Sequence, residues 1–276
     1  MKQALFFLIA APLLAQSTDS LNAALWQQSS VEYRGVVLQA WRSARHSLPR
    51  ALKDRRWTAA LEQRDMNPKQ LKKLPPAIIV DMDETIVDNS PSQKRFFEEG
   101  NGRFDVKIWA AWTAEAKAKA LPGAAEFLRE ARSRGVTIFY VTNRDKQEEE
   151  GTRRNLNEQG FEVKDLPSIP ELGDTLLLRG EREDWTSDKS SRRAAVAKHY
   201  RIIMLGGDDL NDFFPARISP SERMERAREF DGWWGERWIV LPNPSYGSWE
   251  DSILGFERNL TPSEVTKRKL DALKRD

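Results

Sequence analysis

The segment that most constrains the fold of this chain is a short apolar run that ends directly in acidic residues. Ala77-Ile78-Ile79-Val80 is followed at once by Asp81-Met82-Asp83-Glu84-Thr85. A run of branched side chains is typical of a buried parallel strand, and the carboxyl ends of such strands are where open α/β sheets bind ligands. If the extended geometry continues past Val80, Asp81 and Asp83 project to the same side. Two convergent carboxylates at this place suit a metal-assisted nucleophilic centre.

Further apolar runs alternate with helical patterns along the chain. Strands are expected at 136–141, 175–178, 202–205 and 238–241, and helices between them at 124–134, 147–159 and 190–200. This alternation predicts an α/β fold, with a doubly wound parallel sheet and helices on both faces. Residues 16–276 are expected to form a single domain. Within it, 16–74 is an N-terminal helical segment that Pro49 interrupts, which implies two helices or a kink. Residues 89–120 are a small, mainly helical cap insertion.

The first 15 residues are expected to be a secretory signal peptide. Lys2 precedes the apolar stretch from Ala4 to Ala15, which is shorter than the roughly 20 residues of a spanning helix and is followed by polar residues. The chain has no cysteine, and therefore no site for a lipid anchor or a disulfide. We expect an exported protein, periplasmic or secreted, without a stable membrane anchor.

Charge and histidine content exclude two further classes of function. The net charge is only +2, with 44 basic and 42 acidic residues intermingled, so a nucleic-acid polymer is not an expected partner. His46 and His199 lie in helical patterns, and neither stands in the Arg-His-Gly context of a histidine phosphatase.

Polar residues follow several of the expected strands and begin one of the helices. They are Asp81 and Asp83, then Thr142-Asn143-Arg144, then Lys189, and finally Asp208-Asp209 with Asp212. In a doubly wound sheet these positions meet in one crevice. Two carboxylates about 4 Å apart repel by roughly 4 kcal/mol at an effective dielectric of 20, so several of them together need a cation. An all-oxygen donor set favours a hard ion, and Mg²⁺ is the expected cofactor.

These positions resemble a known family. The four ordered motifs of the haloacid dehalogenase (HAD) superfamily are similar to Asp81-Met82-Asp83-Glu84-Thr85, Phe139-Tyr140-Val141-Thr142-Asn143-Arg144, Asp188-Lys189-Ser190, and Gly207-Asp208-Asp209-Leu210-Asn211-Asp212. More narrowly, the segments 25–33 and 241–250 resemble class C acid phosphatases, whose best-known members are surface lipoprotein 5′-nucleotidases. The likeness spans roughly residues 21 to 255 and implies a HAD-like fold.

The resemblance implies a role for each matching residue. Asp81 would be the nucleophile that becomes an aspartyl phosphate, and Asp83 would protonate the leaving alcohol and later deprotonate the attacking water. Thr142 would hydrogen-bond a phosphoryl oxygen, and Lys189 would neutralise charge between the phosphate and the nucleophile. The metal ligands would be Asp81, Asp208 and the backbone carbonyl of Asp83, with Asp212 supporting them or reaching the ion through water.

Substrate contacts are expected from four residues. Trp109 and Tyr246 match family positions that line the leaving-group pocket and can stack on a base or an aromatic ring. Packing between cap and core is an equally good interpretation for Trp109 and a weaker one for Tyr246. Asn89 and Asn143 are further predicted contacts, although Asn89 and its neighbour Asp88 also suit a turn or a helix cap. The cluster of Trp233, Trp234 and Trp238 is assigned to packing.

The resemblance implies an exported, Mg²⁺-dependent acid phosphatase. Its substrates would be small phosphate monoesters such as nucleoside 5′-monophosphates and aryl phosphates, with best activity at acid pH, and a homo-oligomer is compatible with the sequence. Two alternatives remain open: a non-catalytic binding or storage protein on the same fold, and a phosphotransferase that passes the phosphoryl group to an alcohol. The fourth motif also departs from the family, because Asp209 stands where the family usually has asparagine.

Overall fold

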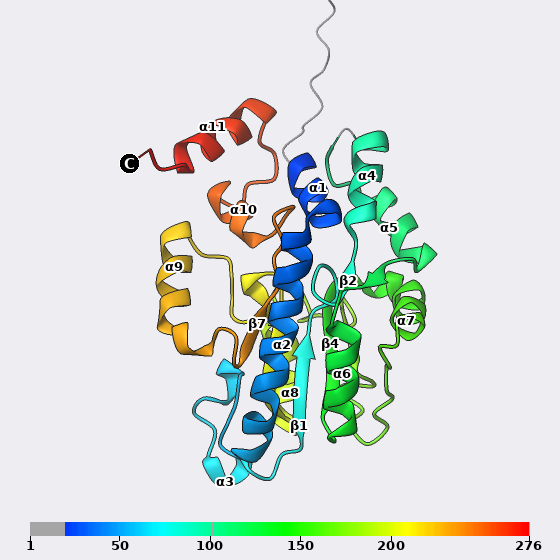
Figure 1. Ribbon diagram of the computed structural model, residues 1–276, viewed down its shortest axis with the longest axis vertical. Coiled ribbons are helices and arrows are strands. Elements are labelled where there is room, and N and C mark those ends of the chain that lie inside the picture. Colours follow the sequence, from blue (N-terminus) through cyan, green and yellow to red (C-terminus); the bar gives the residue numbers. More distant parts are fainter. Residues whose placement is uncertain (1–19, 101, 276) are drawn as a thin grey trace, which may run out of the picture.

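A parallel sheet forms the centre of the molecule. The computed structural model describes residues 20–100 and 102–275, and within them the main sheet has five strands in the order β5-β4-β1-β6-β7 (Figure 1). Each neighbouring pair is parallel. The strands are β1 (Pro76–Val80), β4 (Thr137–Asp145), β5 (Leu176–Arg179), β6 (Arg201–Gly207) and β7 (Trp238–Val240). The predicted doubly wound parallel sheet is confirmed.

Helices cover both faces of this sheet because its strands carry apolar side chains on both sides. On one face, α2 (Val31–Lys53) and α6 (Ala124–Ser133) pack together, with the rings of Trp41 and Phe127 stacked at 5.5 Å. On the other face, α8 (Ser190–His199) joins a cluster that contains Trp238. The edges of the Trp233 and Trp234 rings contact Trp238, which confirms the predicted packing role.

The N-terminal segment differs from its prediction. Helix α1 (Leu21–Ser29) ends at Ser30, whose side chain accepts the Tyr33 N–H at 3.0 Å and so begins α2. The expected division into two helices at Pro49 is wrong, since α2 continues to Lys53, and the alternative of a kink there stays a prediction. A proline this close to the helix end removes one backbone donor without ending the helix. Between Lys53 and β1 the helical structure consists of η1 (Leu61–Gln63) and α3 (Pro68–Leu71) in the described chain.

Two helices lie in the segment expected to form the cap. α4 (Ser90–Glu99) and α5 (Val106–Glu115) are enclosed by the antiparallel pair β2 (Val87–Asp88) and β3 (Lys119–Ala120). α5 packs on α7 (Glu149–Glu158), which follows β4 and the short η2 (Lys146–Glu148). The cap helices therefore lie beside the carboxyl ends of β1 and β4 (Figure 1).

The C-terminal third contains elements that the apolar pattern did not predict. They are η3 (Leu210–Asp212), α9 (Pro220–Glu229), η4 (Asp231–Trp233), α10 (Ser248–Ile253) and α11 (Pro262–Ala272). α9 and α11 each begin at a capping box, at Ser219 and at Thr261, and bury no residue fully. Their helical state follows from capping rather than from an apolar stripe.

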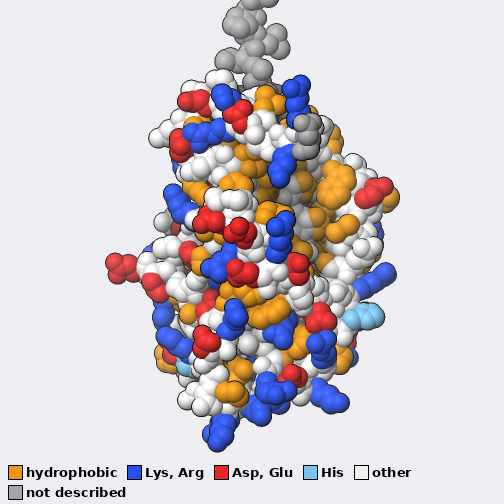
Figure 2. Space-filling view, turned by 90° about the vertical axis from the view of Figure 1, so that its left-hand side faces the viewer, with side chains coloured by type: hydrophobic (Ala, Val, Ile, Leu, Met, Phe, Trp, Pro, Cys, Tyr) orange, Lys and Arg blue, Asp and Glu red, His pale blue; other side chains and the backbone are white. Residues whose placement is uncertain are grey.

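The expectations about export and the membrane concern residues that the structure describes only in part. The predicted signal peptide, residues 1–15, lies outside the described residues. In residues 20–100 and 102–275, no helix has the length and apolar character needed to span a bilayer. Figure 2 shows basic and acidic side chains interspersed over most of the face that it presents.

Candidate active site

The loop after β1 turns sharply within the acidic motif. The Asp81 N–H continues the sheet by donating to the Gly206 carbonyl at 2.9 Å. Three successive N–H groups, from residues 85, 86 and 87, then donate to the Met82 carbonyl, and Glu84 adopts a left-handed φ of 56°. The chain therefore turns directly after Met82, and the carboxylates of Asp81 and Asp83 face different partners.

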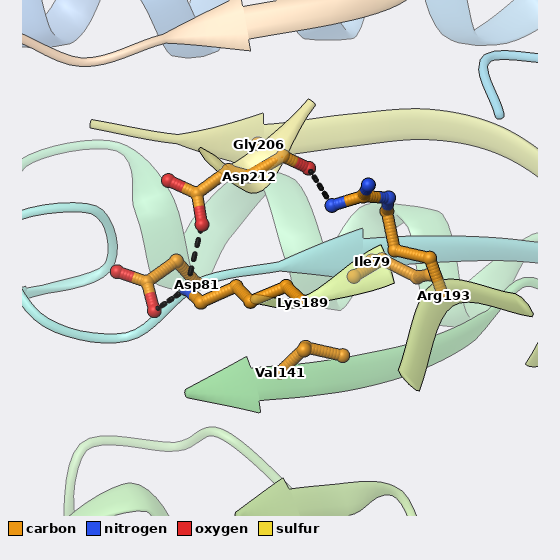
Figure 3. Close-up of a pocket in the computed structure, with 7 residues that line it drawn as sticks. All are labelled: Ile79, Asp81, Val141, Lys189, Arg193, Gly206 and Asp212. Atoms are coloured by element: carbon orange, nitrogen blue, oxygen red, sulfur yellow. Dashed lines mark hydrogen bonds and ion pairs between the residues drawn. The ribbon is translucent and has the colours of Figure 1, made fainter. Parts of the chain in front are cut away.

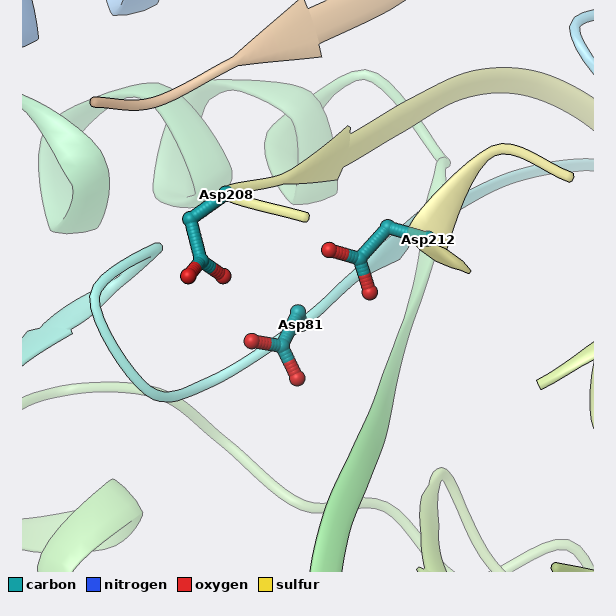
Figure 4. Close-up of side chains that lie close together, drawn as sticks. All are labelled: Asp81, Asp208 and Asp212. Carbon is teal, nitrogen blue, oxygen red and sulfur yellow. The ribbon is translucent and has the colours of Figure 1, made fainter. Parts of the chain in front are cut away.

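Three carboxylates meet at the carboxyl end of the sheet. Among the described residues, Asp81, Asp208 and Asp212 offer oxygen atoms that all lie within 4.8 Å of one another (Figure 4). Asp81 follows β1, Asp208 follows β6 and Asp212 ends η3, so the parallel topology brings them together. The Thr85 hydroxyl at 3.1 Å and the Asn243 amide at 2.8 Å each donate to Asp208. The predicted approach of Asp208 to Asp81 is confirmed.

Lys189 neutralises part of this cluster. Its Nζ lies 2.5 Å from Asp81 Oδ1 and 2.6 Å from Asp212 Oδ1, and its side chain is buried (Figure 3). Burial alone would lower the pKa of Lys189, but Asp212 and Asp81 more than offset it and hold the pKa above its ordinary value. The ammonium group is therefore charged at neutral pH and borders a small pocket that is also lined by Ile79, Val141, Arg193 and Gly206.

The remaining carboxylates are short of positive charge. Burial, and then repulsion from Asp81 and Asp212, raises the pKa of Asp208 well above its ordinary value. Burial raises the pKa of Asp212 to about 7, although Lys189 opposes the shift. Such groups need either protons or a cation, and three carboxylates with no nitrogen or sulfur donor match the preference of a hard divalent ion. Asp83 is expected to bind the metal through its backbone carbonyl, and this role stays a prediction.

The Asp83 carboxylate is held apart from this cluster. Arg144 donates to Asp83 Oδ1 from Nη2 at 2.7 Å and from Nε at 3.0 Å, and Asn89 Nδ2 donates to the same oxygen at 2.8 Å. The side chain of Asn89 does not cap α4; instead Asp88 accepts the Ser90 N–H at 2.8 Å. The Asn89 side chain thus positions Asp83, and its contact with substrate stays a prediction.

Thr142 and Asn143 lie in the last part of β4. The hydroxyl of Thr142 accepts the backbone N–H of Arg144 at 3.1 Å, and the residue is fully buried at the strand end next to β1. The Asn143 amide donates to the Ser187 carbonyl at 3.0 Å and accepts from Arg192 at 2.6 Å. Asn143 therefore holds the loop that leads to Lys189, and its expected contact with substrate stays untested.

Trp109 and Tyr246 reach the site from the cap and from the loop after β7. The Arg144 guanidinium lies 5.6 Å from the centre of the Trp109 ring, which also packs against the core. The hydroxyl of Tyr246 donates to Glu84, whose other carboxylate oxygen accepts the Asn89 N–H at 2.8 Å. Burial, followed by repulsion from Asp83, raises the pKa of Glu84 to about 8. Glu84 thus joins the loop after β7, which carries Tyr246, to the start of α4 at Asn89.

Sequence reasoning gave no role to three residues that shape this site. Arg144 stood inside a quoted motif, and a cation directly after two polar residues at a strand end was a signal that it meets a carboxylate. Glu84 adjoins Asp83, but its link to Tyr246 spans 162 positions and has no local signature. Asn243 stands between two prolines, and nothing in that pattern indicates that it orients Asp208.

Comparisons with known proteins agree with this arrangement. Residues 6–249 match a family model described as HAD superfamily, subfamily IIIB (acid phosphatase). The structure is similar to a class C acid phosphatase from Bacillus anthracis with tungstate bound, at a TM-score of 0.77 and 29% identity, over 95% of this chain and 99% of that one. A second structure of a class C acid phosphatase from the same organism gives a TM-score of 0.75 at 29% identity, over 93% and 97%.

Proposed function

The chain belongs to the acid phosphatases of HAD subfamily IIIB, phosphoric monoester hydrolases, and from this premise we propose that it is exported and hydrolyses small phosphate monoesters through a covalent aspartyl phosphate on Asp81. One observation carries the proposal: Asp81 stands at the tip of β1 with Lys189 at 2.5 Å and within 4.8 Å of the carboxylates of Asp208 and Asp212. A non-catalytic binding or storage protein disagrees with the family membership.

In the first half of the reaction, an Asp81 oxygen attacks the phosphorus atom as the bond to the leaving oxygen breaks. Asp83 gives its proton to that oxygen, so an alcohol departs and Asp83 is left as a carboxylate. Lys189 and Thr142 face the charge of the phosphoryl oxygens. Positioning and charge neutralisation of this kind supply most of the catalysis in phosphoryl transfer.

In the second half, water attacks the phosphorus atom of the aspartyl phosphate. Asp83 accepts a proton from this water, the bond to Asp81 breaks, and inorganic phosphate leaves. Both groups then have the protonation state in which they began.

We propose Mg²⁺ as the metal, held by Asp81, Asp208, the Asp83 carbonyl and Asp212. Family membership supports a divalent ion, and an oxygen-only donor set supports magnesium among such ions. When bound, the ion would neutralise phosphoryl charge and align the phosphate with Asp81.

The decisive experiment measures release of p-nitrophenol from p-nitrophenyl phosphate by wild type and by Asp81→Asn. Wild type should be inactive in EDTA and recover with excess Mg²⁺, and Asp81→Asn should stay inactive in both. Asp65→Asn, which removes an exposed carboxylate between η1 and α3, is the matched control and should behave like wild type. Full activity in Asp81→Asn, or in EDTA, would remove the mechanism.

Substrate class and export need separate measurements. Tungstate bound to the similar Bacillus anthracis enzyme is a tetrahedral oxyanion, which supports a phosphate site here. Trp109 and Tyr246 are proposed to stack on aryl or nucleoside leaving groups, so a panel of monophosphates should favour these over small alkyl esters. Adding a nucleoside and measuring a new phosphate ester separates phosphotransfer from hydrolysis. N-terminal sequencing of protein from the periplasm or medium should begin near residue 16.

A further inference from the structure

The two carboxylate oxygens of Asp83, the proposed proton donor, accept different numbers of hydrogen bonds. Oδ1 accepts from Arg144 Nη2 at 2.7 Å, from Arg144 Nε at 3.0 Å and from Asn89 Nδ2 at 2.8 Å. Oδ2 receives, among the described residues, the longer contact from Arg144 Nε at 3.2 Å. A carboxyl proton resides on the oxygen that faces fewer donors. Oδ2 is therefore the oxygen that can carry a proton to the leaving group.

Arg144 is buried, and its strongest hydrogen bonds go to the Asp83 carboxylate. It is 2% exposed, and a buried guanidinium is tolerated when it is paired and hydrogen-bonded. Beyond Asp83, it donates to Thr152 of α7 at 3.3 Å and to Asn89 Oδ1 at 3.4 Å, and its plane lies near the Trp109 ring. Arg144 thus sits between Asp83 and a residue of cap helix α5.

Asn89 makes a second connection to the same helix. Trp112 Nε1 donates to Asn89 Oδ1 at 2.8 Å. An indole nitrogen can only donate, so it fixes the amide with its oxygen toward α5 and its NH₂ group toward Asp83. α5 therefore contacts both groups that grip Asp83: Trp109 lies against Arg144, and Trp112 orients Asn89.

We propose that Arg144, Asn89 and Trp112 are positioning residues that place Asp83 Oδ2 against the leaving oxygen, so that the seating of α5 decides how well a basic leaving group is protonated. This inference rests on the proposed function, because Asp83 matters here as the proton donor. None of the three residues needs to touch the substrate. Their effect should appear with leaving groups that require a proton and vanish with those that do not.

The test compares two esters of similar shape, benzyl phosphate and p-nitrophenyl phosphate. Benzyl alkoxide is strongly basic and needs a proton, whereas p-nitrophenolate departs without one. kcat/KM is measured because it reports the first, leaving-group-dependent half of the reaction. General acid catalysis contributes about 10²–10⁴-fold, and misplacing the acid should forfeit part of that.

The variants are Arg144→Lys, which loses the planar fork, and Trp112→Phe, which loses the indole N–H but keeps a ring beneath Arg95. Each should lower kcat/KM for benzyl phosphate about 10-fold or more relative to p-nitrophenyl phosphate. Matched controls are Arg201→Lys and Trp41→Phe. Arg201 is equally buried but donates to carbonyls at the opposite end of the sheet, and Trp41 Nε1 has no partner among the described residues. The controls should leave the ratio of the two substrates unchanged.

The results distinguish this inference from the mechanism beneath it. Asp83→Asn should show the largest change in the ratio. If Asp83→Asn does and the Arg144 and Trp112 variants do not, the positioning inference is overturned and the proposed function stands. Equal losses on both esters in these variants overturn it too, since they mean a general disturbance. No change of ratio in Asp83→Asn would refute the proton shuttle and the inference with it.

Discussion

Replacing Asp208 by asparagine should make the metal-free protein more stable while abolishing its response to metal. Without a cation, the buried carboxylates of Asp81 and Asp212 and the half-buried carboxylate of Asp208 face the one ammonium of Lys189 among the described groups of this cluster. Asp208→Asn removes a charge and keeps the shape. Its oxygen can still accept from Asn243, and its NH₂ group can donate to the Thr85 hydroxyl.

The expected gain follows from Coulomb repulsion less the relief already given by protons. Two unit charges 4.8 Å apart, the largest separation in the cluster, repel by about 3.5 kcal/mol at an effective dielectric of 20. The raised pKa of Asp208 means that part of this repulsion is already relieved by proton uptake. We expect the free energy of unfolding to rise by about 1–3 kcal/mol at pH 7 in EDTA.

The pH dependence has a defined sign. The pKa values of Asp208 and Asp212 are raised in the folded state, that of Asp212 to about 7 from an ordinary 3.8. Between these two pH values the folded protein therefore binds more protons than the unfolded protein. This contribution to stability is present at low pH and is lost as pH rises toward 7. Metal-free wild type should therefore lose more stability between pH 5 and pH 7 than Asp208→Asn does.

Urea unfolding followed by tryptophan fluorescence measures both effects, with Asp65→Asn as the exposed-carboxylate control. Saturating Mg²⁺ at about 100 times its Kd should add about 2.7 kcal/mol to wild type and little to Asp208→Asn. A metal-free variant that is less stable than wild type, or one that gains as much from Mg²⁺, would refute the cluster as a charge-strained metal site.

Three further changes test the packing around the site. Gly207→Ala would place a Cβ 2.1 Å from Asp212 Oδ2, so the carboxylate must move, and metal affinity measured by titration calorimetry should fall about 10-fold or more. Gly151→Ala would place a Cβ 2.4 Å from the Thr113 carbonyl and push α5 from α7; thermal unfolding should report a loss of about 1–3 kcal/mol, and an unchanged Tm would contradict this packing. Hydrogen bonds from Arg95 and Lys117 lower the pKa of Glu115 to about 2, so the contribution of this carboxylate to protein stability is present above pH 4.5 and lost toward pH 2. Glu115→Gln should lower the free energy of unfolding by about 0.5–1 kcal/mol at pH 6, and this difference from wild type should shrink on acidification.

The element order was predictable because it depends on local patterns. Runs such as 202–205 are branched and apolar, and a buried parallel strand needs little else to be recognised. The break in the N-terminal helices was misplaced because Pro49 is a strong local signal, whereas Ser30 acts only through its capping hydrogen bond. Helices α9 and α11 were missed for a related reason, since they lack a buried stripe.

In the candidate site, too, the features that depend on local patterns were predictable and those that depend on tertiary contacts were not. The sequence by itself determined that Asp81 and Asp208 follow strands of a parallel sheet, and the carboxyl ends of such strands lie at one edge. That these two strands are neighbours was decided by the tertiary structure. Only the tertiary structure decided that the Asp83 carboxylate turns to Arg144 and Asn89, because the direction of a side chain after a strand depends on the turn that follows it. The link between Glu84 and Tyr246 was likewise invisible, since contacts between residues far apart in the chain exist only once the whole chain has folded.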